Sequence, residues 1–270
     1  MALALASILA EAALRHPERT ALIDGPNRIY YQDLWEQARC YASALEAQGI
    51  RAGDRVALMI PNVPDFPRTY YGILTLGAVV VPVHCLLTGR EVAYVLRDSG
   101  AKLLVCAGTL LEAGLAGARE AGIPCLSVLA EPAAPDGDLA SLARTLPPVA
   151  TYAQREANDD AVILYTSGTT GIPKGAVLTQ SNLVFNATIA AFDVFGFRQD
   201  DVLLGALPLF HSFGQSVVMN TGFRVGAAVA LVPRFDADAV LNLMVDENVT
   251  IFAGVPTMYL ALIEAAKRDP

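Results

Sequence analysis

Apolar and polar positions alternate with two different periods along the chain, and each period predicts one kind of element. Short apolar runs such as Arg55–Ile60 and Lys102–Cys106 have the length of buried strands. Between such runs, apolar residues recur every three or four positions, as at Leu34, Ala38 and Tyr41, which is typical of a helix. Regular alternation of strands and helices predicts a mostly parallel, doubly wound α/β fold with helices on both faces of the sheets.

Individual elements can be expected along most of the chain. The start, Met1–Leu14, has helical spacing, and the strands Thr20–Asp24 and Arg28–Tyr31 flank a hairpin turn. Capping-box spacing at a helix start is found at Thr88 with Glu91 and at Thr109 with Glu112. Further strands are expected at Ala78–Val83, Pro124–Val128, Ala161–Thr166, Ala176–Thr179, Val202–Ala206, Ala227–Val232 and Val249–Ala253, and further helices from Asp65 and Ser181, over Ser212–Gly222 and Asp236–Glu247, and from Pro256.

The alternation stops over Glu131–Asp160, where prolines and scattered charges favour a surface connection. A two-lobed molecule is therefore expected. Residues 1–158 would form a first α/β lobe with its linker, and residues 159–270 a second, truncated lobe that carries the phosphate loop described below.

Composition excludes several classes of protein. A net charge of -8 argues against nucleic-acid binding, which needs a basic face. The uncharged stretch Thr69–Gly89 has the length of a membrane span, but its glycines and proline favour a buried helix followed by a strand. The N-terminus lacks the basic region of a signal peptide, so a cytoplasmic protein is expected. The 4 cysteines form no CxxC pair and read as buried free thiols, no metal-ligand spacing is present, and His16 and His84 belong to no motif.

One polar loop after a predicted buried strand carries the most informative chemistry. The segment Thr166–Gly175, TSGTTGIPKG, contains hydroxyl side chains, glycines and Lys174. Open α/β sheets bind ligands at the carboxyl ends of their strands. Glycines there let backbone N–H groups approach an anion, and the hydroxyls and the lysine add donors. The pattern predicts a phosphate-binding loop rather than an ordinary polar turn.

The loop does not have the Walker A pattern of nucleotide hydrolases and kinases. That motif requires glycine directly before the lysine and Ser or Thr directly after it. Lys174 instead stands between Pro173 and Gly175, so both positions fail.

The loop resembles the signature phosphate loop of the adenylate-forming (AMP-binding) superfamily, and the chain is most similar to its acyl-CoA synthetase or fatty-acid–CoA ligase branch. The similarity covers essentially the whole chain. It runs through Ile29–Leu45, Asp54–Asn62, Gly77–Pro82, Glu91–Leu104, Leu178–Leu183, Leu207–Gly214 and Gly254–Tyr259.

The resemblance implies a two-step reaction with ATP, magnesium and coenzyme A. A fatty or aryl carboxylic acid and ATP would give an acyl-adenylate and pyrophosphate, and the thiol of coenzyme A would then displace AMP. Thr166 is expected on the α-phosphate side. The residues that the resemblance assigns to the phosphates of ATP are Thr166, Ser167, Gly168, Thr169, Thr170, Gly171 and Lys174.

A second segment, Pro208–Gly214, follows another predicted strand and faces the same edge of a sheet. By itself it also fits a histidine and two aromatic residues at a capped helix start. The resemblance implies instead that His211 lies beside the acyl site or gates it, that Phe213 lines it, and that Gly254 and Thr257 border it.

Several motifs that the family carries further along the chain are absent from the 270 residues. They include the magnesium-binding glutamate, the ribose-binding aspartate and the C-terminal domain with the adenylation lysine. No complete catalytic set is therefore expected, and an N-terminal portion that is inactive alone is the main hypothesis. The alternatives are a half-enzyme that needs a separate C-terminal part, and a non-catalytic ligand-binding or homodimerising module.

Overall fold

Two β-sheets form the frame of the molecule in the computed structural model, which describes residues 3–166 and 172–268. Within these residues the first sheet has the strand order β6-β5-β3-β4-β7-β8 and the second the order β2-β1-β10-β9. Neighbouring strands are parallel except in the pairs β1–β2 and β7–β8. The strands are β1 (Thr20–Asp24), β2 (Asn27–Tyr30), β3 (Arg55–Met59), β4 (Val79–Pro82), β5 (Ala101–Ala107), β6 (Cys125–Val128), β7 (Asp160–Thr166), β8 (Lys174–Thr179), β9 (Val202–Gly205) and β10 (Ala228–Leu231).

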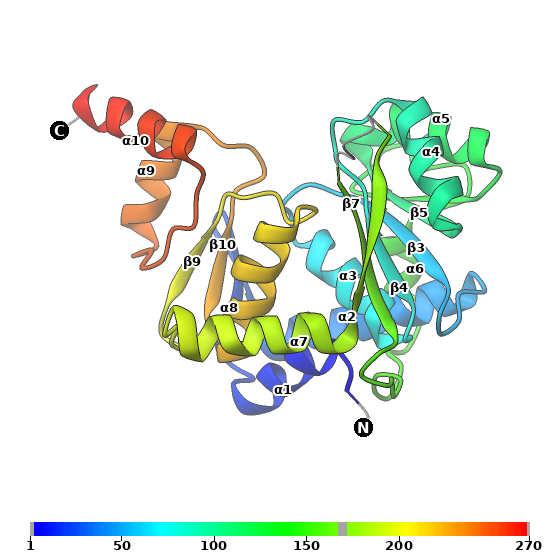
Figure 1. Ribbon diagram of the computed structural model, residues 1–270, viewed down its shortest axis with the longest axis horizontal. Coiled ribbons are helices and arrows are strands. Elements are labelled where there is room, and N and C mark those ends of the chain that lie inside the picture. The colour runs from blue at the N-terminus through cyan, green and yellow to red at the C-terminus, as the bar shows by residue number, and fades with distance from the viewer. Residues whose placement is uncertain (1–2, 167–171, 269–270) are drawn as a thin grey trace.

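Helices pack around both sheets, and the two sheets stand side by side (Figure 1). The predicted mostly parallel, doubly wound α/β class is therefore confirmed. The α-helices are α1 (Ser7–Arg15), α2 (Tyr31–Ala47), α3 (Asp65–Thr75), α4 (Gly89–Ser99), α5 (Leu111–Ala121), α6 (Leu139–Ala143), α7 (Gln180–Ile189), α8 (Thr221–Val225), α9 (Ala237–Asp246) and α10 (Pro256–Arg268). A 3-10 turn, η1 (Gly108–Leu110), and two π-helical turns, η2 (Ala190–Val194) and η3 (Gly214–Asn220), complete the helical elements among the described residues.

Strand β3 shows how one short apolar run serves two cores. Successive side chains of a strand point to opposite faces of the sheet. Val56 and Leu58 accordingly belong to a core with α2 and α3, whereas Ala57 and Met59 belong to a core with α4 and α5. The first of these cores also contains Val229 of β10, so it is continuous between the two sheets. Burial on both faces explains why this strand is apolar at nearly every position.

Each sheet draws strands from both sides of the expected lobe boundary at residues 158/159. The hairpin β1–β2, near the N-terminus, joins the second sheet through the pairing of Leu22 with Val229. Strands β7 and β8, from beyond residue 158, join the first sheet through the pairing of Val80 with Val162. The division into 1–158 and 159–270 remains a prediction, and the hydrogen-bonded sheets do not follow it.

The expected capping box at Thr109 and Glu112 is wrong. Helix α5 begins at Leu111 after the turn η1, and no side chain caps its first turn. Gly108 lies so close to the preceding segment that a Cβ there would meet the Leu129 carbonyl oxygen at 2.3 Å. This packing holds Thr109 within the 3-10 turn, away from a capping position. The expected box at Thr88 and Glu91 is present at the start of α4.

Two elements in the second half differ from the expectation. The region Ser212–Gly222 is helical, but most of it is the wider π-helical turn η3, followed by the short helix α8. The expected strand Val249–Ala253 is reduced to one bridge, between Ile251 and Leu203 of β9. The connection Glu131–Asp160 also contains the short helix α6, whose N-cap Asp138 accepts a hydrogen bond from the Ser141 N–H at 2.8 Å.

The uncharged stretch Thr69–Gly89 forms most of α3 followed by β4, and both are buried. In the described part of the chain, no helix combines the length and the hydrophobicity that crossing a bilayer requires.

Candidate functional site

The predicted phosphate loop connects the two strands of an antiparallel hairpin. Thr166 at the end of β7 pairs with Lys174 at the start of β8, so both ends of the loop are fixed next to each other. Both residues are exposed, and the side chain of Lys174 has no hydrogen-bond or ion-pair partner among the described residues. The predicted phosphate ligands Ser167, Gly168, Thr169, Thr170 and Gly171 lie outside the described residues.

Two tyrosine hydroxyls connect the loop end of this hairpin to α4. The Tyr94 hydroxyl donates to the Pro173 carbonyl at 2.9 Å, and the Tyr165 hydroxyl donates to the Asp98 carboxylate at 2.7 Å. Burial, followed by the hydrogen bond to Asp98, raises the pKa of Tyr165, so its hydroxyl stays protonated and remains a donor. The two rings meet edge to face at 6.5 Å. Fixing the strand ends in this way presents Lys174 to solvent from a rigid support.

The second predicted segment, Pro208–Gly214, is held by a buried asparagine from the other sheet. Asn62 follows β3 and is 4% exposed. Its amide nitrogen donates to the carbonyls of Gly205 and Leu207, each at 2.8 Å, and its amide oxygen accepts from the Leu209 N–H at 2.8 Å. One side chain therefore satisfies three backbone groups of the loop that leads to His211. Sequence patterns do not reveal this role, because Asn62 lies far along the chain from the segment that it holds.

Gly214 allows this segment to turn back on itself, and we predict that Gly214→Ala is destabilising. A Cβ at Gly214 would lie 2.3 Å from the Pro208 carbonyl oxygen and 2.8 Å from that of Leu207. Because both contacts are backbone atoms, the loop must shift, and we expect the free energy of unfolding to fall by about 1–3 kcal/mol. Urea denaturation measures this loss. The control is Gly222→Ala. The new Cβ there would lie 3.4 Å from its nearest neighbour, a side-chain carbon of Leu203, which is an ordinary contact distance, and alanine favours helix α8. An equal loss in both variants would contradict the explanation.

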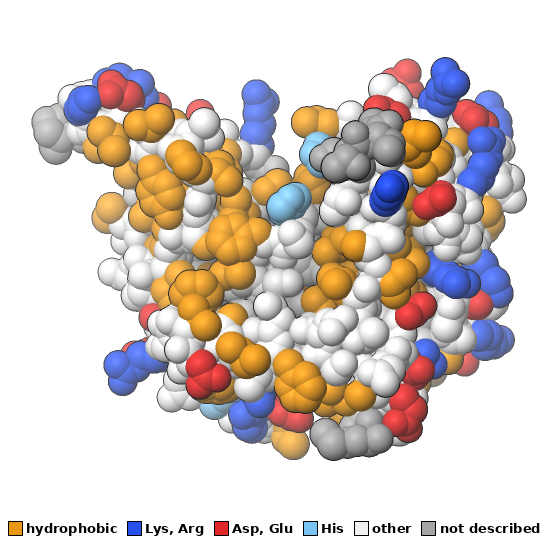
Figure 2. Space-filling model, viewed as in Figure 1, with side chains coloured by type: hydrophobic (Ala, Val, Ile, Leu, Met, Phe, Trp, Pro, Cys, Tyr) orange, Lys and Arg blue, Asp and Glu red, His pale blue; other side chains and the backbone are white. Residues whose placement is uncertain are grey.

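The structure brings His84, which belongs to no sequence motif, against the segment that contains His211. The His84 ring lies 4.7 Å from the ring of Phe210, the residue before His211. Partial burial, followed by the electrostatic effect of His211, lowers the pKa of His84. Figure 2 shows histidine side chains beside the hollow at the top of the molecule, between its two halves. His84 and His211 come from different sheets, so only the folded chain reveals the pair.

The other predicted pocket residues are less closely joined. Phe213 is 39% exposed beside His211, whose ring accepts the Phe213 N–H at 3.3 Å. Gly254 lies just before α10, and a Cβ there would meet the Phe252 ring at 2.5 Å. Within the described residues, no hydrogen bond or ring contact joins Gly254 or Thr257 to His211. Whether they border one acyl site remains a prediction.

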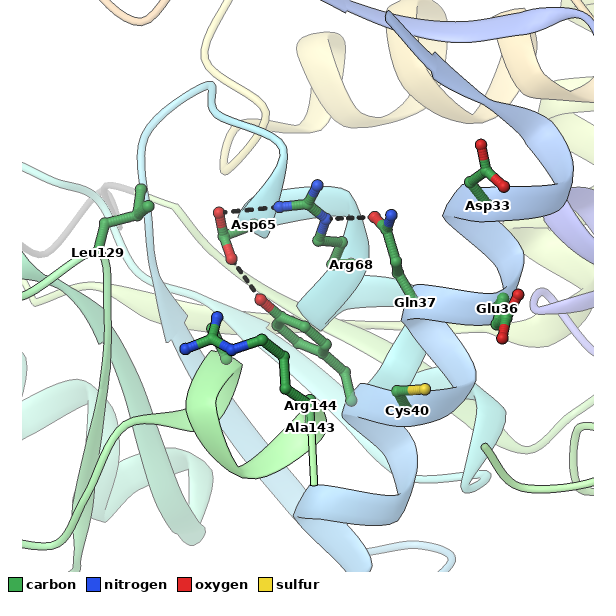
Figure 3. Close-up of a pocket in the computed structure, with 11 residues that line it drawn as sticks. Asp33, Glu36, Gln37, Cys40, Asp65, Arg68, Leu129, Ala143 and Arg144 are labelled. Carbon is green, nitrogen blue, oxygen red and sulfur yellow. Dashed lines mark hydrogen bonds and ion pairs between the residues drawn. The ribbon is translucent and has the colours of Figure 1, made fainter. Parts of the chain in front are cut away.

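A separate concavity of about 460 Å³ lies between α2, α3 and α6, away from β7, β8 and the segment Pro208–Gly214. Figure 3 shows Arg68 between Asp65 and Gln37, with a dashed line to each. The Tyr41 hydroxyl donates to the buried Asp65 carboxylate, and Arg68 pairs with it at 3.3 Å and also donates to Gln37 at 2.7 Å. Burial and the neighbouring Asp65 raise the pKa of Tyr41. These polar side chains are hydrogen-bonded to one another, and their bonds link α2 to α3.

The described residues form no cluster of three or more metal-ligating side chains. Over residues 3–166 and 172–268, no three His, Cys, Asp or Glu side chains come together in a way that could hold a metal ion. No chemical step is therefore assigned to magnesium on this part of the chain.

The chain is similar to CoA ligases in both sequence and structure. A long-chain-fatty-acid–CoA ligase of Bacillus subtilis is 29% identical over 287 residues, which covers 96% of this chain and 51% of that protein. A feruloyl-CoA synthase of an Amycolatopsis species is 35% identical over 248 residues, covering 91% of this chain and 47% of that protein. The solved structure of a long-chain-fatty-acid-CoA ligase from Archaeoglobus fulgidus matches with a TM-score of 0.90 and 26% identity, covering 99% of this chain and 54% of that one.

The chain thus spans about half the length of the curated relatives it matches. The expectation of an N-terminal portion from the adenylate-forming superfamily is confirmed. A model of the AMP-binding enzyme family matches residues 9–270, and the chain therefore belongs to the family of AMP-binding enzymes.

Proposed function

We propose that the chain is the phosphate-binding and acyl-binding part of an ATP-dependent acyl-CoA ligase. The observation that carries the proposal is the loop end of the β7–β8 hairpin. There Thr166 and Lys174 stand side by side at the two ends of the predicted phosphate loop, and the Lys174 side chain has no partner in the part of the chain that the structure describes. In an AMP-binding enzyme, a hydroxyl and a free ammonium group at this place suit the polyphosphate of ATP.

The proposed chemistry depends on neutralising charge and fixing geometry. The carboxylate of the substrate must attack the α-phosphorus of ATP, although both groups are anionic. Lys174 would offset the charge of the polyphosphate, and Thr166 would donate a hydrogen bond on the α-phosphate side. Fixed strand ends favour this role, because preorganised donors need no rearrangement during the reaction. Coenzyme A would then accept the acyl group from the adenylate.

The substrate class follows the relatives. Their names include a long-chain fatty acid in one case and a feruloyl group in another. We therefore propose a carboxylic acid with an aliphatic or aromatic body, and the exposed Phe213 beside His211 suits either.

The chain is proposed to need the remainder of the ligase fold for activity. Apolar side chains along α7 and η2 remain about half exposed, and Figure 2 shows hydrophobic groups on this face. A contiguous apolar face of this kind marks a surface that another segment covers. The residues are Phe185, Ile189, Phe192, Val194 and Phe195. The relatives' second half is the proposed occupant, because this chain spans only about half of their length.

ATP–pyrophosphate exchange tests the proposal. The chain alone is expected to give no exchange. Fused to the part of the Bacillus subtilis ligase beyond the matched region, it is expected to catalyse carboxylate-dependent exchange. Lys174→Ala in the fusion should reduce exchange about 10–100-fold, since a hydrogen bond to a charged group contributes about 1.5–3 kcal/mol.

The matched control is Lys102→Ala, which also removes one lysine charge. Lys102 lies on β5 and pairs with Asp54 at 2.7 Å, so exchange should be unchanged. Strong exchange by the chain alone would contradict the proposed incompleteness. Absence of exchange in the fusion, or equal effects of the two lysine variants, would contradict the assigned function.

A further inference from the structure

Two hydrogen bonds connect one turn of helix α4 to the two ends of the predicted phosphate loop. Tyr94 and Asp98 are four positions apart on α4, so they lie on the same face of the helix. The Tyr94 hydroxyl donates to the carbonyl of Pro173, the residue directly before the loop's lysine. The hydroxyl of Tyr165, the residue directly before the loop's first threonine, donates to the Asp98 carboxylate. These two hydrogen bonds, the α4 anchors, therefore act one residue away from a candidate phosphate ligand on each strand.

The α4 anchors have a firm support. The acceptor of the Tyr165 hydroxyl is a carboxylate, and hydrogen bonds to ionised groups are stronger than those between neutral groups. The rings of Tyr94 and Tyr165 meet edge to face at 6.5 Å, and both pack against the core that α4 and α5 form over the first sheet. A shift of the hairpin would therefore disturb both anchors together.

The last glycine of the loop motif leaves the space that the Tyr165 ring occupies. Gly175 pairs with Tyr165 across the hairpin, so both residues belong to the same face of the sheet. A Cβ at Gly175 would lie 2.8 Å from a side-chain carbon of Ile163, 3.3 Å from the Tyr165 ring and 3.4 Å from its hydroxyl. The φ of Gly175 lies outside the left-handed region, so the requirement is for space. Any side chain there would push the ring away from Asp98.

We propose that Asp98 and Tyr94 are positioning residues for ATP, which hold Thr166 and Lys174 at the spacing that the polyphosphate requires. The proposal rests on the proposed ligase function, because that function supplies the ATP. Donors that are fixed before binding lose less freedom when the ligand arrives, so loss of an anchor should weaken ATP binding. The segment Pro208–Gly214 is held by other hydrogen bonds, so the carboxylic acid should bind as before.

The KM values for ATP–pyrophosphate exchange in the fusion test this division. In Tyr165→Phe, which keeps the ring and removes the hydroxyl, we expect the KM for ATP to rise about 10-fold and the KM for the carboxylic acid to stay within about 2-fold. Asp98→Ala should have the same effect. Asp98→Asn should restore most of the affinity, because its amide oxygen still accepts the hydroxyl. The matched control is Tyr30→Phe, since Tyr30 lies on β2 and its hydroxyl has no partner among the described residues.

Combined variants show whether these residues act through one hydrogen bond. Tyr165→Phe together with Asp98→Ala should raise the KM for ATP no further than either change alone, since both remove the same bond. Gly175→Ala should raise the KM for ATP about as much as Tyr165→Phe does. It should add little to Tyr165→Phe, because the bond to Asp98 is then already lost.

Amide hydrogen exchange in the full chain tests the α4 anchors without any reaction. Residues 172–179 should exchange about 10-fold faster in Tyr165→Phe and in Asp98→Ala than in the unchanged chain, and at the unchanged rate in Tyr30→Phe. Residues of β3 should exchange equally in all variants. This comparison separates loosening of the hairpin from a loss of global stability.

Four results would overturn the proposal. They are unchanged hydrogen exchange of residues 172–179 in Tyr165→Phe, an unchanged KM for ATP in that variant, an equal rise of both KM values, and additive effects of the Tyr165 and Asp98 variants. Failure of the ligase function is distinguishable from these results. If the fusion gives no pyrophosphate exchange while Tyr165→Phe loosens the hairpin, the anchors stand and the assigned function fails. If the fusion is active and Tyr165→Phe changes neither measurement, only the anchors fail.

Discussion

Asn62→Ala is expected to destabilise the chain by about 3–5 kcal/mol. The substitution removes three hydrogen bonds and leaves the Leu207 carbonyl and the Leu209 N–H without a partner among the described residues, whereas the Gly205 carbonyl keeps the hydrogen bond from the Val232 N–H. Each buried polar group left unsatisfied costs about 1–3 kcal/mol. Chemical denaturation measures the loss. The same change should also broaden the NMR signals of His211, because Asn62 holds the loop that leads to that residue.

Asn186→Ala provides the control for this experiment. Asn186 is exposed on α7 and makes no side-chain hydrogen bond among the described residues, so its replacement should change stability by less than about 0.5 kcal/mol. If Asn62→Ala were as harmless as this control, the loop would have another anchor, and the role given to Asn62 would be wrong.

Phe223→Ala is the second substitution with a large expected effect, again about 3–5 kcal/mol. Phe223 of α8 is 0% exposed and contacts the ring of Tyr31 at 5.7 Å and that of Tyr71 at 5.9 Å. Tyr31 and Tyr71 belong to α2 and α3, so the three rings join helices of the two halves. Loss of the ring leaves a cavity at this joint. The expected result is a lower midpoint in thermal or urea unfolding.

Phe185→Ala removes an equally large ring from the exposed face of α7. Phe185 is 52% exposed, so its truncation should cost little in the isolated chain. A similar loss in both phenylalanine variants would show that ring contacts at the joint contribute nothing special. In the fusion with a second half, Phe185→Ala should become costly, because the proposed occupant would cover that ring.

The fold class could be predicted because burial leaves a clear pattern in a doubly wound sheet. The run from Arg55 to Ile60 is apolar because both faces of β3 are covered, and the glycine after α4, Gly100, adopts the left-handed conformation that ends a helix. The pairing of one strand with another, in contrast, could not be predicted from local sequence. Nothing local to the hairpin β1–β2 indicates that it pairs with β10 rather than with β3, since that choice depends on the packing of the whole chain.

The candidate site also has one part that the sequence predicts and another that only the folded chain reveals. The hydroxyl-rich loop with Lys174 is a local motif, so the sequence alone indicates its chemistry. Asn62 and His84 are single residues of ordinary type, and their roles arise from contacts with the segment that contains Phe210 and His211. Spacing rules fail for such contacts. They also failed at Thr109, where the close approach of Gly108 to the Leu129 backbone determined the start of α5.

The pairing of β1 with β10 imposes an order on biosynthesis. The pairing of Leu22 with Val229 cannot form until Val229, roughly 200 residues later, has been synthesised. At the usual rates of translation this delay lasts roughly 10–40 s. During that interval the apolar strand Thr20–Asp24 has a free edge outside the ribosome, where chaperones and proteases can reach it. Yield in the cell is therefore expected to depend on how this N-terminal hairpin is protected until the last strand of its sheet emerges.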